Sequence, residues 1–242
     1  KFSSLLGVTF DAPDYSDQVA DYFFDKENNF FFDRRLADGS FINEMGCEAY
    51  TPLWTKVATS EQVAKMLPIL QDIAKFSTYI PFPTIAADNP KYDPKGYWRG
   101  PIWLDQTYFA IRGLRNYGYT KLADEYTLQV FDRLQGLTED APIHENYGTH
   151  TGERLKAPHF SWSSSHLLMM YEEYGKEITH HSSRCCLSVF SRCKISGVIS
   201  GSNIYNCTGV FRYACTLFFM FCINVMNIQM SISITEYHKP HK

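Results

Sequence analysis

The chain has 242 residues, a formal net charge of −3 and 16% aromatic residues. That length suffices for one domain with a substantial core and a second, smaller one. The slight negative charge argues against a nucleic-acid-binding surface, which would need an excess of lysine and arginine. Aromatic residues are typical of carbohydrate sites, but ordinary cores are also rich in them, so composition alone leaves the function open.

The two ends of the chain carry signals of their own. The start, Lys-Phe-Ser-Ser, has no initiator methionine and no apolar segment of a signal peptide, so we expect an internal piece of a longer protein. Six of the seven cysteines lie in the last quarter, without C-x-x-C spacing or a histidine pair at zinc-finger distance. The sequence therefore predicts no metal site and leaves disulfide pairing open.

The first predicted element is a short helix that ends at Phe24. Asp14, Ser16 and Asp17 are of the types that cap helix N-termini. The run 25–33 then places oxygen-bearing side chains at positions 25, 27 and 29, but it lacks the glycine and the closing glutamate of a calcium loop. A turn between a helix and an aromatic hairpin is the favoured interpretation.

A second helix begins with a recognisable cap. Thr59 and Gln62 form a capping-box pattern, and apolar residues at helical spacing follow as far as Ile73. Pro68 is expected to kink or restart this helix. Ahead of it, Glu48 and Trp54 flank a proline-initiated helix and either line a cleft or belong to a solvated turn.

A long connection over residues 77–95 leads to an unusual stretch that begins at Tyr97. Trp98 and Arg99 are followed by Gly100, which permits a close backbone approach or a positive φ, and by Pro101, which suits the first position of a helix. An indole face and a forked guanidinium at a helix mouth can bind a sugar. The alternative is a capped core helix whose tryptophans only pack.

Two further helices are predicted beyond the one that begins at Pro101 and closes with Asn116 and Gly118. One spans residues 121–135 and ends at Gly136, and the other begins with Ser161 as its cap and ends at Tyr174. The long loop 139–160 lies between them. The predicted architecture is all-α, with helix pairs joined by long loops that carry the polar residues.

The composition changes after residue 177. No acidic residue occurs between Glu177 and Glu236, whereas the first 177 residues hold 25 of the 26 acidic residues. The apolar stretch 214–226 is too short and too interrupted for a membrane span, so membrane association is not supported. We expect residues 178–242 to be foreign to the domain, as a disordered or mistranslated tail would be.

Several stretches resemble the catalytic domain of glycoside hydrolase family 63, which includes mannosyl-oligosaccharide glucosidases and bacterial α-glucosidases. The Y-W-R-G-P-x-W run is specific, and its combination with E-N-Y and F-S-W-S strengthens the resemblance. Trehalases of the same clan, with a similar E-K-Y, are the nearest alternative. The matching stretches follow the family's order over residues 15–175: 46–54, 81–84, 97–106, 145–147 with 151–153, and 160–163.

The resemblance implies that residues 1–177 form the C-terminal part of an (α/α)6 barrel that hydrolyses α-glucosides with inversion. Inversion uses a carboxylic acid that protonates the leaving oxygen and a carboxylate that activates water, roughly 6.5–9.5 Å apart. By its place in E-N-Y, Glu145 is implied to be that base. The sugar subsite is expected from the remaining candidates: Glu48, Trp54, Trp98, Arg99, Gly100, Trp103, Asp105 and Trp162.

The family's general acid is an aspartate in a Trp-Asp motif, and no such pair occurs in this sequence. We therefore expect this chain alone to lack meaningful glucosidase activity. The implied partner is an oligosaccharide with terminal α-glucose. No cofactor is expected, and the calcium of some bacterial relatives would have most of its ligands upstream. The compartment would be the endoplasmic reticulum for a eukaryotic processing enzyme, and the periplasm or the exterior for a bacterial one.

A non-enzymatic alternative stays open beside the hydrolase. A helical sugar-binding or interaction module, or a degenerate gene fragment, would bind glucose-type ligands weakly and would not need Glu145.

Overall fold

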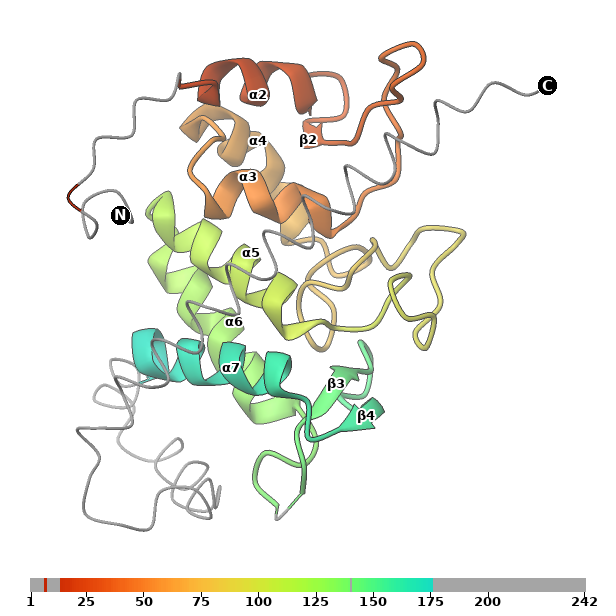
Figure 1. The fold of residues 1–242 in the computed structure, drawn as a ribbon, viewed down its shortest axis with the longest axis vertical. Coiled ribbons are helices and arrows are strands. Elements are labelled where there is room, and N and C mark those ends of the chain that lie inside the picture. The colour runs from red at the N-terminus through yellow and green to blue at the C-terminus, as the bar shows by residue number, and fades with distance from the viewer. Residues whose placement is uncertain (1–6, 8–13, 140, 176–242) are drawn as a thin grey trace. The chain divides into compact units, whose positions relative to one another are not determined.

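A computed structural model describes residues 7, 14–139 and 141–175 (Figure 1). The predicted boundary at residue 177 and the region 178–242 lie outside this part. The described elements are the α-helices α2 (Ser16–Phe23), α3 (Tyr50–Trp54), α4 (Ser60–Leu70), α5 (Leu104–Asn116), α6 (Thr120–Arg133) and α7 (Ser161–Met170), the helical turns η1 (Cys47–Ala49) and η2 (Tyr171–Gly175), and the strands β1 (Phe24–Asp25), β2 (Phe30–Phe31), β3 (His144–Tyr147) and β4 (Arg154–Pro158).

The N-terminal helix and the aromatic hairpin are confirmed. The α2 helix ends where β1 begins, and β1 pairs antiparallel with β2. In the turn between the strands, the Asp25 carboxylate accepts the backbone N–H groups of Glu27 and Asn28 and the side-chain amide of Asn28. The predicted turn is therefore present, but it lies inside the hairpin, between β1 and β2, rather than between the helix and the hairpin.

The capping box of α4 is confirmed, whereas its predicted end was wrong. The Thr59 hydroxyl accepts the Gln62 N–H at 3.2 Å, and the Gln62 side chain accepts the Thr59 N–H at 2.8 Å. The helix contains Pro68 but stops at Leu70. Ile73, predicted to lie on the apolar face, is therefore 81% exposed. A proline near the end of a helix favours such an early stop, because it removes one of the last hydrogen bonds.

The core of the described region is built on α5. The α5 and α6 helices form an antiparallel hairpin whose turn includes Gly118 at φ +84°, as the glycine position predicts (Figure 1). On another side, α3 packs closely on α5 because Gly113 has no side chain. A Cβ built there would lie 2.6 Å from Cβ of Leu53. One face of α5 and the residue before it are buried in the core: Trp103, Thr107, Ala110, Ile111 and Leu114.

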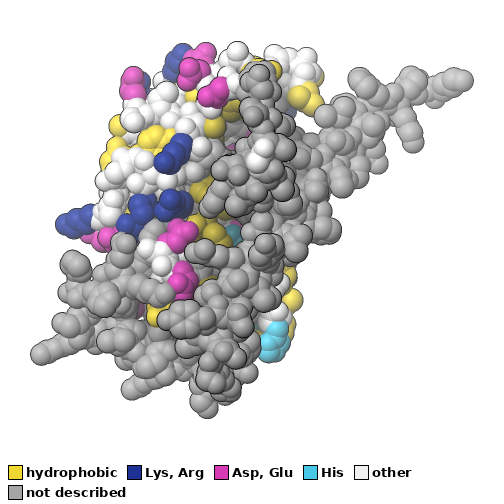
Figure 2. Space-filling view, turned by 60° about the vertical axis from the view of Figure 1, so that its left-hand side comes forward, with side chains coloured by type: hydrophobic (Ala, Val, Ile, Leu, Met, Phe, Trp, Pro, Cys, Tyr) yellow, Lys and Arg dark blue, Asp and Glu magenta, His cyan; other side chains and the backbone are white. Residues whose placement is uncertain are grey.

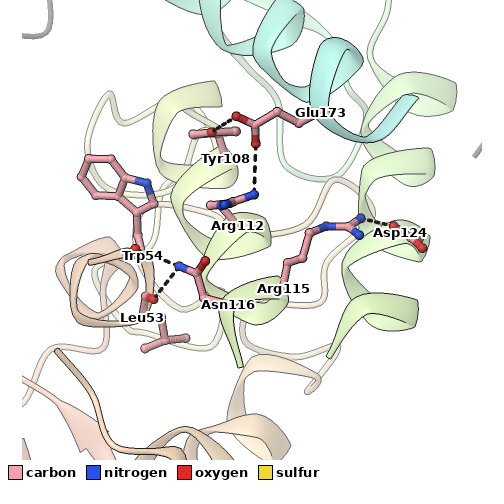
Figure 3. A network of polar contacts seen from close by, with 8 residues as sticks. All are labelled: Leu53, Trp54, Tyr108, Arg112, Arg115, Asn116, Asp124 and Glu173. Carbon is pink, nitrogen blue, oxygen red and sulfur yellow. Dashed lines mark hydrogen bonds and ion pairs between the residues drawn. The ribbon is translucent and has the colours of Figure 1, made fainter. Parts of the chain in front are cut away.

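Polar contacts join the middle and the C-terminal end of α5 to its neighbours (Figure 3). The Asn116 side chain donates to the carbonyl oxygens of Leu53 and Trp54 at the end of α3. The Arg115 guanidinium pairs with Asp124 of α6. Toward the other end of the network, Tyr108 and Arg112 both reach Glu173 of η2, at 3.0 and 3.5 Å. These contacts fix α5 relative to α3, α6 and η2.

The predicted start of α5 at Pro101 was wrong, because a backbone pairing holds this segment extended. Ile102 donates its N–H to the carbonyl of Tyr147 at 2.8 Å and accepts the N–H of Tyr147 at 3.0 Å. The helix therefore begins at Leu104 after the extended residue Trp103. Helical propensity cannot reveal this pairing, because its partner lies 45 residues away in the chain.

The region 139–160 was predicted to be a loop, but it contains the antiparallel hairpin of β3 and β4. β3 does not alternate apolar and polar residues, and β4 is largely exposed, so neither strand shows a buried apolar face in the sequence. The all-α prediction is therefore corrected to a helix-rich fold with two small antiparallel hairpins. At the following helix, Phe160 rather than Ser161 occupies the cap position of α7, and the end at Gly175 takes a π-helical turn.

The face shown in Figure 2 carries basic and acidic side chains intermingled, with apolar patches between them. Lys65 with Glu61 and Lys26 with Asp21 are pairs of opposite charge among the described residues. A surface on which both signs alternate does not present the single-sign field that attracts a polyanion.

Candidate active site

Four aromatic rings gather around Trp103, at the N-terminal end of α5. Trp98 stacks parallel on it with ring centroids 4.1 Å apart, and Tyr97 and Trp162 meet it edge-on at 5.1 and 5.6 Å. Phe160 adds a fourth ring at 6.4 Å. Trp103 is only 2% exposed, whereas Trp98 is 41% exposed. The cluster is thus a platform whose outer layer is the indole of Trp98, a surface suited to the C–H face of a sugar.

Glu145 faces this cluster from β3. Its carboxylate oxygen Oε1 accepts a hydrogen bond of 2.8 Å from the Tyr97 hydroxyl. Its backbone carbonyl accepts one of 2.8 Å from the Ser163 hydroxyl of α7. The register of the hairpin shifts between His144 and Asn146, so Glu145 sits at an irregularity of the kind that redirects a side chain. The half-buried Glu145 and the indoles are therefore brought together, although 41 residues separate Trp103 from β3.

Tyr97 is the residue of this site that the sequence argument missed. Its backbone has φ +61°, a left-handed conformation that is uncommon for a bulky residue and costs on the order of 1–3 kcal/mol. The strained backbone is held by Trp103, whose indole N–H donates to the Tyr97 carbonyl at 3.0 Å. The available signal was its place at the head of the Y-W-R-G-P run.

Arg99 and Gly100 shape the turn that carries the tryptophan. The Arg99 guanidinium lies 3.5 Å from the Asp93 carboxylate, with its side chain 58% exposed. The backbone N–H of Asp93 also donates to the Arg99 carbonyl at 2.7 Å. A Cβ at Gly100 would lie 2.4 Å from the Asp93 carbonyl oxygen. The predicted close approach at Gly100 is confirmed, and it is made to the backbone of the chain itself.

Asp105 is a buried carboxyl at the start of α5, two residues after Trp103. It is 4% exposed, and its carboxylate accepts the side-chain amide of Gln106 at 2.9 Å. Burial raises the pKa of Asp105, and the nearby His166 opposes that rise. His166 is 6% exposed, and burial lowers its pKa while the charge of Asp105 raises it in part. Direct contact of Asp105 with a sugar stays a prediction.

Glu48 is a half-buried carboxyl on η1. It accepts the Gly46 N–H at 3.1 Å. Burial raises its pKa to about 7, and the charges of Asp33 and Glu44 act in the same direction. Burial raises the pKa of the Cys47 thiol, and the charges of Glu48 and Asp105 raise it further.

The two flanking tryptophans belong to different groups of rings. Trp162 contacts Trp103 and lies 6.2 Å from Phe160, so it is part of the cluster beside Glu145. Trp54 stacks on Phe109 at 4.2 Å, and the Phe109 ring lies 6.0 Å from that of His166. Trp162 is therefore the better placed of the two to flank a ligand on Trp98.

Neither a metal cluster nor a membrane helix is present among residues 14–139 and 141–175. No three histidine, cysteine or carboxylate side chains within these ranges are close enough to hold a metal ion. No helix there combines the length and the apolar character needed to cross a bilayer.

Comparisons with known proteins place this chain in a family. The model of the mannosylglycerate hydrolase MGH1-like glycoside hydrolase domain matches residues 10–163. The mannosylglycerate hydrolase of Thermus thermophilus is 25% identical over 141 residues, which cover 58% of this chain and 33% of that protein. Mannosylglycerate hydrolase MGH1 of Selaginella moellendorffii is 27% identical over 148 residues, which cover 60% of this chain and 29% of that protein. The chain thus spans about a third of the length of these relatives.

Solved structures show the same fold. The family 63 mannosylglycerate hydrolase from Thermus thermophilus in complex with glucose aligns with a TM-score of 0.54 and 23% identity, over 63% of this chain and 35% of that one. Neutral trehalase Nth1 from Saccharomyces cerevisiae aligns with a TM-score of 0.55 and 20% identity, over 73% and 32%. Both support a helix-rich fold of the (α/α)6 barrel type.

These matches confirm the resemblance to family 63, and they name mannosylglycerate hydrolases rather than the mannosyl-oligosaccharide glucosidases suggested by the motifs. The chain belongs to the mannosylglycerate hydrolase MGH1-like family of glycoside hydrolases.

Proposed function

We propose that this chain supplies the general base and part of the sugar subsite of an inverting α-glycosidase. The observation that carries the proposal is the hydrogen bond between Tyr97 and Glu145 beside stacked Trp98 and Trp103. This bond joins a half-buried carboxylate to a tyrosine whose ring centroid is 6.2 Å from that of the exposed Trp98, which supports the proposal. A sugar on Trp98 and a water on Glu145 would then be neighbours, as inversion requires.

The chemistry assigned to Glu145 is the removal of a proton from the attacking water. Its Oε1 is oriented by the Tyr97 hydroxyl, and its backbone is anchored by Ser163. A base held in this way loses little orientational freedom when the water reacts. The general acid is not assigned to any residue of this chain.

The names of the relatives and the exposed charge of Arg99, the residue after Trp98, support a proposal for the substrate class. A hexose linked α to glycerate is a small anionic glycoside, and relatives of this chain are named mannosylglycerate hydrolases. The exposed guanidinium of Arg99 offers donors of the kind that bind a carboxylate. We therefore propose such a glycoside as the preferred candidate substrate, and an oligosaccharide with terminal α-glucose as the alternative candidate.

The test grafts residues 10–163 into the Thermus thermophilus relative in place of the segment that they match, so that a complete barrel is present. In this chimera, Glu145→Gln should lower kcat on mannosylglycerate by roughly 10²–10⁴-fold while sugar binding persists, because general base catalysis contributes that much. Glu153→Gln, in the turn of the same hairpin, is the matched control and should leave kcat unchanged. Equal kcat in the Glu145 variant and the parent chimera would contradict the assignment.

Calorimetry on the chain alone separates the enzyme from the non-enzymatic alternative. The calorimetry titrates the chain with four ligands: glucose, mannosylglycerate, kojibiose and nigerose. Proton NMR of the chimera's first product would show the inverted anomer if the base activates water directly. A chimera that binds sugar but never turns over, with or without Glu145, would favour the binding-module alternative.

A further inference from the structure

Two buried threonine hydroxyls contact the backbone where the chain enters the core after Trp98, and the chemistry assigned to Glu145 uses neither of them. Thr84 is 3% exposed and Thr149 is 0% exposed. Trp98 and the residue after it are exposed, whereas Gly100 and the three residues that follow it are buried. The backbone that the threonines contact is therefore the base of the turn that carries the outer indole.

The Thr84 hydroxyl makes two hydrogen bonds to adjacent residues of this turn. Its oxygen accepts the N–H of Gly100 at 3.0 Å, and the hydroxyl donates to the carbonyl oxygen of Pro101 at 3.3 Å. A hydroxyl can donate and accept at the same time, which an apolar side chain of the same shape cannot do. Because Gly100 is buried, the loss of this partner would be costly for its N–H.

The Thr149 hydroxyl reaches the same turn from the hairpin of β3 and β4. It donates to the carbonyl oxygen of Gly100 at 2.6 Å. Two residues further on, Ile102 exchanges backbone hydrogen bonds with Tyr147 of β3. Both backbone polar groups of Gly100 are thus bound by a threonine hydroxyl, the N–H by Thr84 and the carbonyl by Thr149.

The segment 80–84, which contains the P-F-P-T stretch, supports both threonines. The Ile80 N–H donates to the backbone carbonyl of Thr149 at 2.9 Å, and Thr84 is the last residue of the segment. Between them, Phe82 is completely buried at φ +66°, a left-handed conformation that is uncommon for a bulky residue. Such a conformation persists only where the surroundings over-determine it. The segment is therefore a fixed support for both hydroxyls.

From these contacts we infer that Thr84 and Thr149 are positioning residues that hold the two stacked indoles in place and, being buried, do not touch the sugar. Trp98 lies two residues before Gly100, and Trp103 lies three residues after it. Two indoles five residues apart stack at 4.1 Å only if the chain between them turns back, and the bound peptide groups lie in that turn. The inference deepens the proposed function and rests on it only where sugar binding is concerned.

The first measurement is the hydrogen exchange of the Gly100 amide in the full chain, followed by NMR. Thr84→Val keeps the shape of the side chain but removes the hydroxyl, so this amide should exchange roughly tenfold faster, whereas Thr84→Ser should keep the wild-type rate. The rate is taken relative to the amides of α6, so that a general loss of stability cancels.

Thr127→Val is the matched control for this measurement. Thr127 is also completely buried, but its hydroxyl donates to the carbonyl of Ala123 within α6, so the variant should leave the Gly100 rate unchanged. An unchanged rate in Thr84→Val would contradict the hydrogen bond on which the inference depends.

The second measurement reads the stacked indoles and the sugar. Closely stacked indoles give an exciton couplet in circular dichroism, and its loss in Trp98→Phe assigns it to this pair. Thr84→Val and Thr149→Val should each diminish the couplet and weaken glucose binding in calorimetry by roughly tenfold, because the loss of a supporting hydrogen bond loosens a preorganised site. Serine at either position, and Thr127→Val, should preserve both properties.

Urea denaturation establishes that each variant is folded before it is scored. A hydroxyl that only stabilised the fold would lower stability on its removal while leaving the couplet and the glucose affinity at their wild-type values. That result in both valine variants would overturn the positioning role.

The outcomes separate this inference from the proposed function. Faster exchange at Gly100 and a diminished couplet, with no glucose binding even by the wild type, would support the positioning role and count against the sugar site. Glucose binding and a couplet that both valine variants leave at full strength would count against the positioning role and leave the sugar site standing.

Discussion

The hydroxyl of Tyr97 connects the two parts of the candidate site, the carboxylate and the aromatic cluster. It links the carboxylate of Glu145 to a ring that packs on Trp103, and the strained backbone beneath it is held by the indole N–H of the same tryptophan. Strain of this kind persists only where the surroundings over-determine the conformation. We interpret Tyr97 as a residue that orients the base.

Replacing Tyr97 with phenylalanine tests that role in the chimera. Tyr97→Phe removes the donor to Oε1 but keeps the ring on Trp103, so kcat should fall by roughly 10–100-fold, the equivalent of one hydrogen bond to a charged group. KM should change much less, because the indole face of Trp98 is untouched.

Tyr92→Phe is the control for this experiment. The Tyr92 hydroxyl lies 3.0 Å from Nε2 of His150. Tyr92 belongs to the connection that precedes Tyr97. A kcat that falls equally in both variants would show that the segment, rather than the bond to Glu145, is responsible.

At the scale of elements, the contact between α3 and α5 depends on one missing side chain. Because Gly113 has no side chain, the backbone of α5 at this residue lies directly against Leu53 of α3. The Asn116 side chain donates hydrogen bonds to the carbonyl oxygens at the end of α3. This contact orients the helix whose first turn follows Trp103. The packing of α3 therefore bears on the geometry of the aromatic cluster.

In Gly113→Ala the added Cβ would lie 2.6 Å from that of Leu53, so the helices must move apart, at a cost of about 1–3 kcal/mol. The gain of about 1 kcal/mol in helix propensity offsets part of this cost, and the net free energy of unfolding should fall by up to about 2 kcal/mol. Urea denaturation measures the difference.

Gly118→Asn is a suitable comparison. This residue has φ +84° and nothing lies within 4 Å of its Cβ position, and asparagine tolerates that conformation better than other residues. An alanine at 113 that stabilises the chain would contradict the close packing.

At the scale of the whole molecule, buried ionisable groups make stability depend on pH. The pKa of Glu48 is raised from 4.5 to about 7 by burial. Between these values the folded protein holds a proton that the unfolded chain has released. Raising the pH through this window therefore removes stability, and the loss is complete above about pH 7.

Glu48→Gln should accordingly be as stable as the wild type near pH 4.5 and more stable at pH 8, by on the order of 2 kcal/mol. Glutamine resembles the protonated carboxyl and cannot titrate. The opposite contribution of His166, whose lowered pKa costs stability on acidification below 6.5, is common to both proteins and cancels in the difference. Thermal melts from pH 4.5 to 8 measure the difference in stability between the two proteins. Parallel curves of stability against pH would refute the prediction.

The local signals in the sequence were sufficient where a structure is made by neighbours in the chain. The capping box at Thr59 and the glycine that ends α5 are as predicted, and Asp25 closes a turn, although inside the hairpin. Each involves hydrogen bonds or backbone angles within a few residues, so side-chain type decides them. The E-N-Y and Y-W-R-G-P motifs likewise identified the family from residues alone.

Only the tertiary structure decided how these pieces meet. Tyr147 pairs with Ile102 and delays the start of α5, and the Tyr97 hydroxyl reaches Glu145 across 48 residues. Such pairings depend on which backbone edge or buried charge is left to satisfy after the helices have packed. Propensity and periodicity describe neighbours along the chain and do not carry this information.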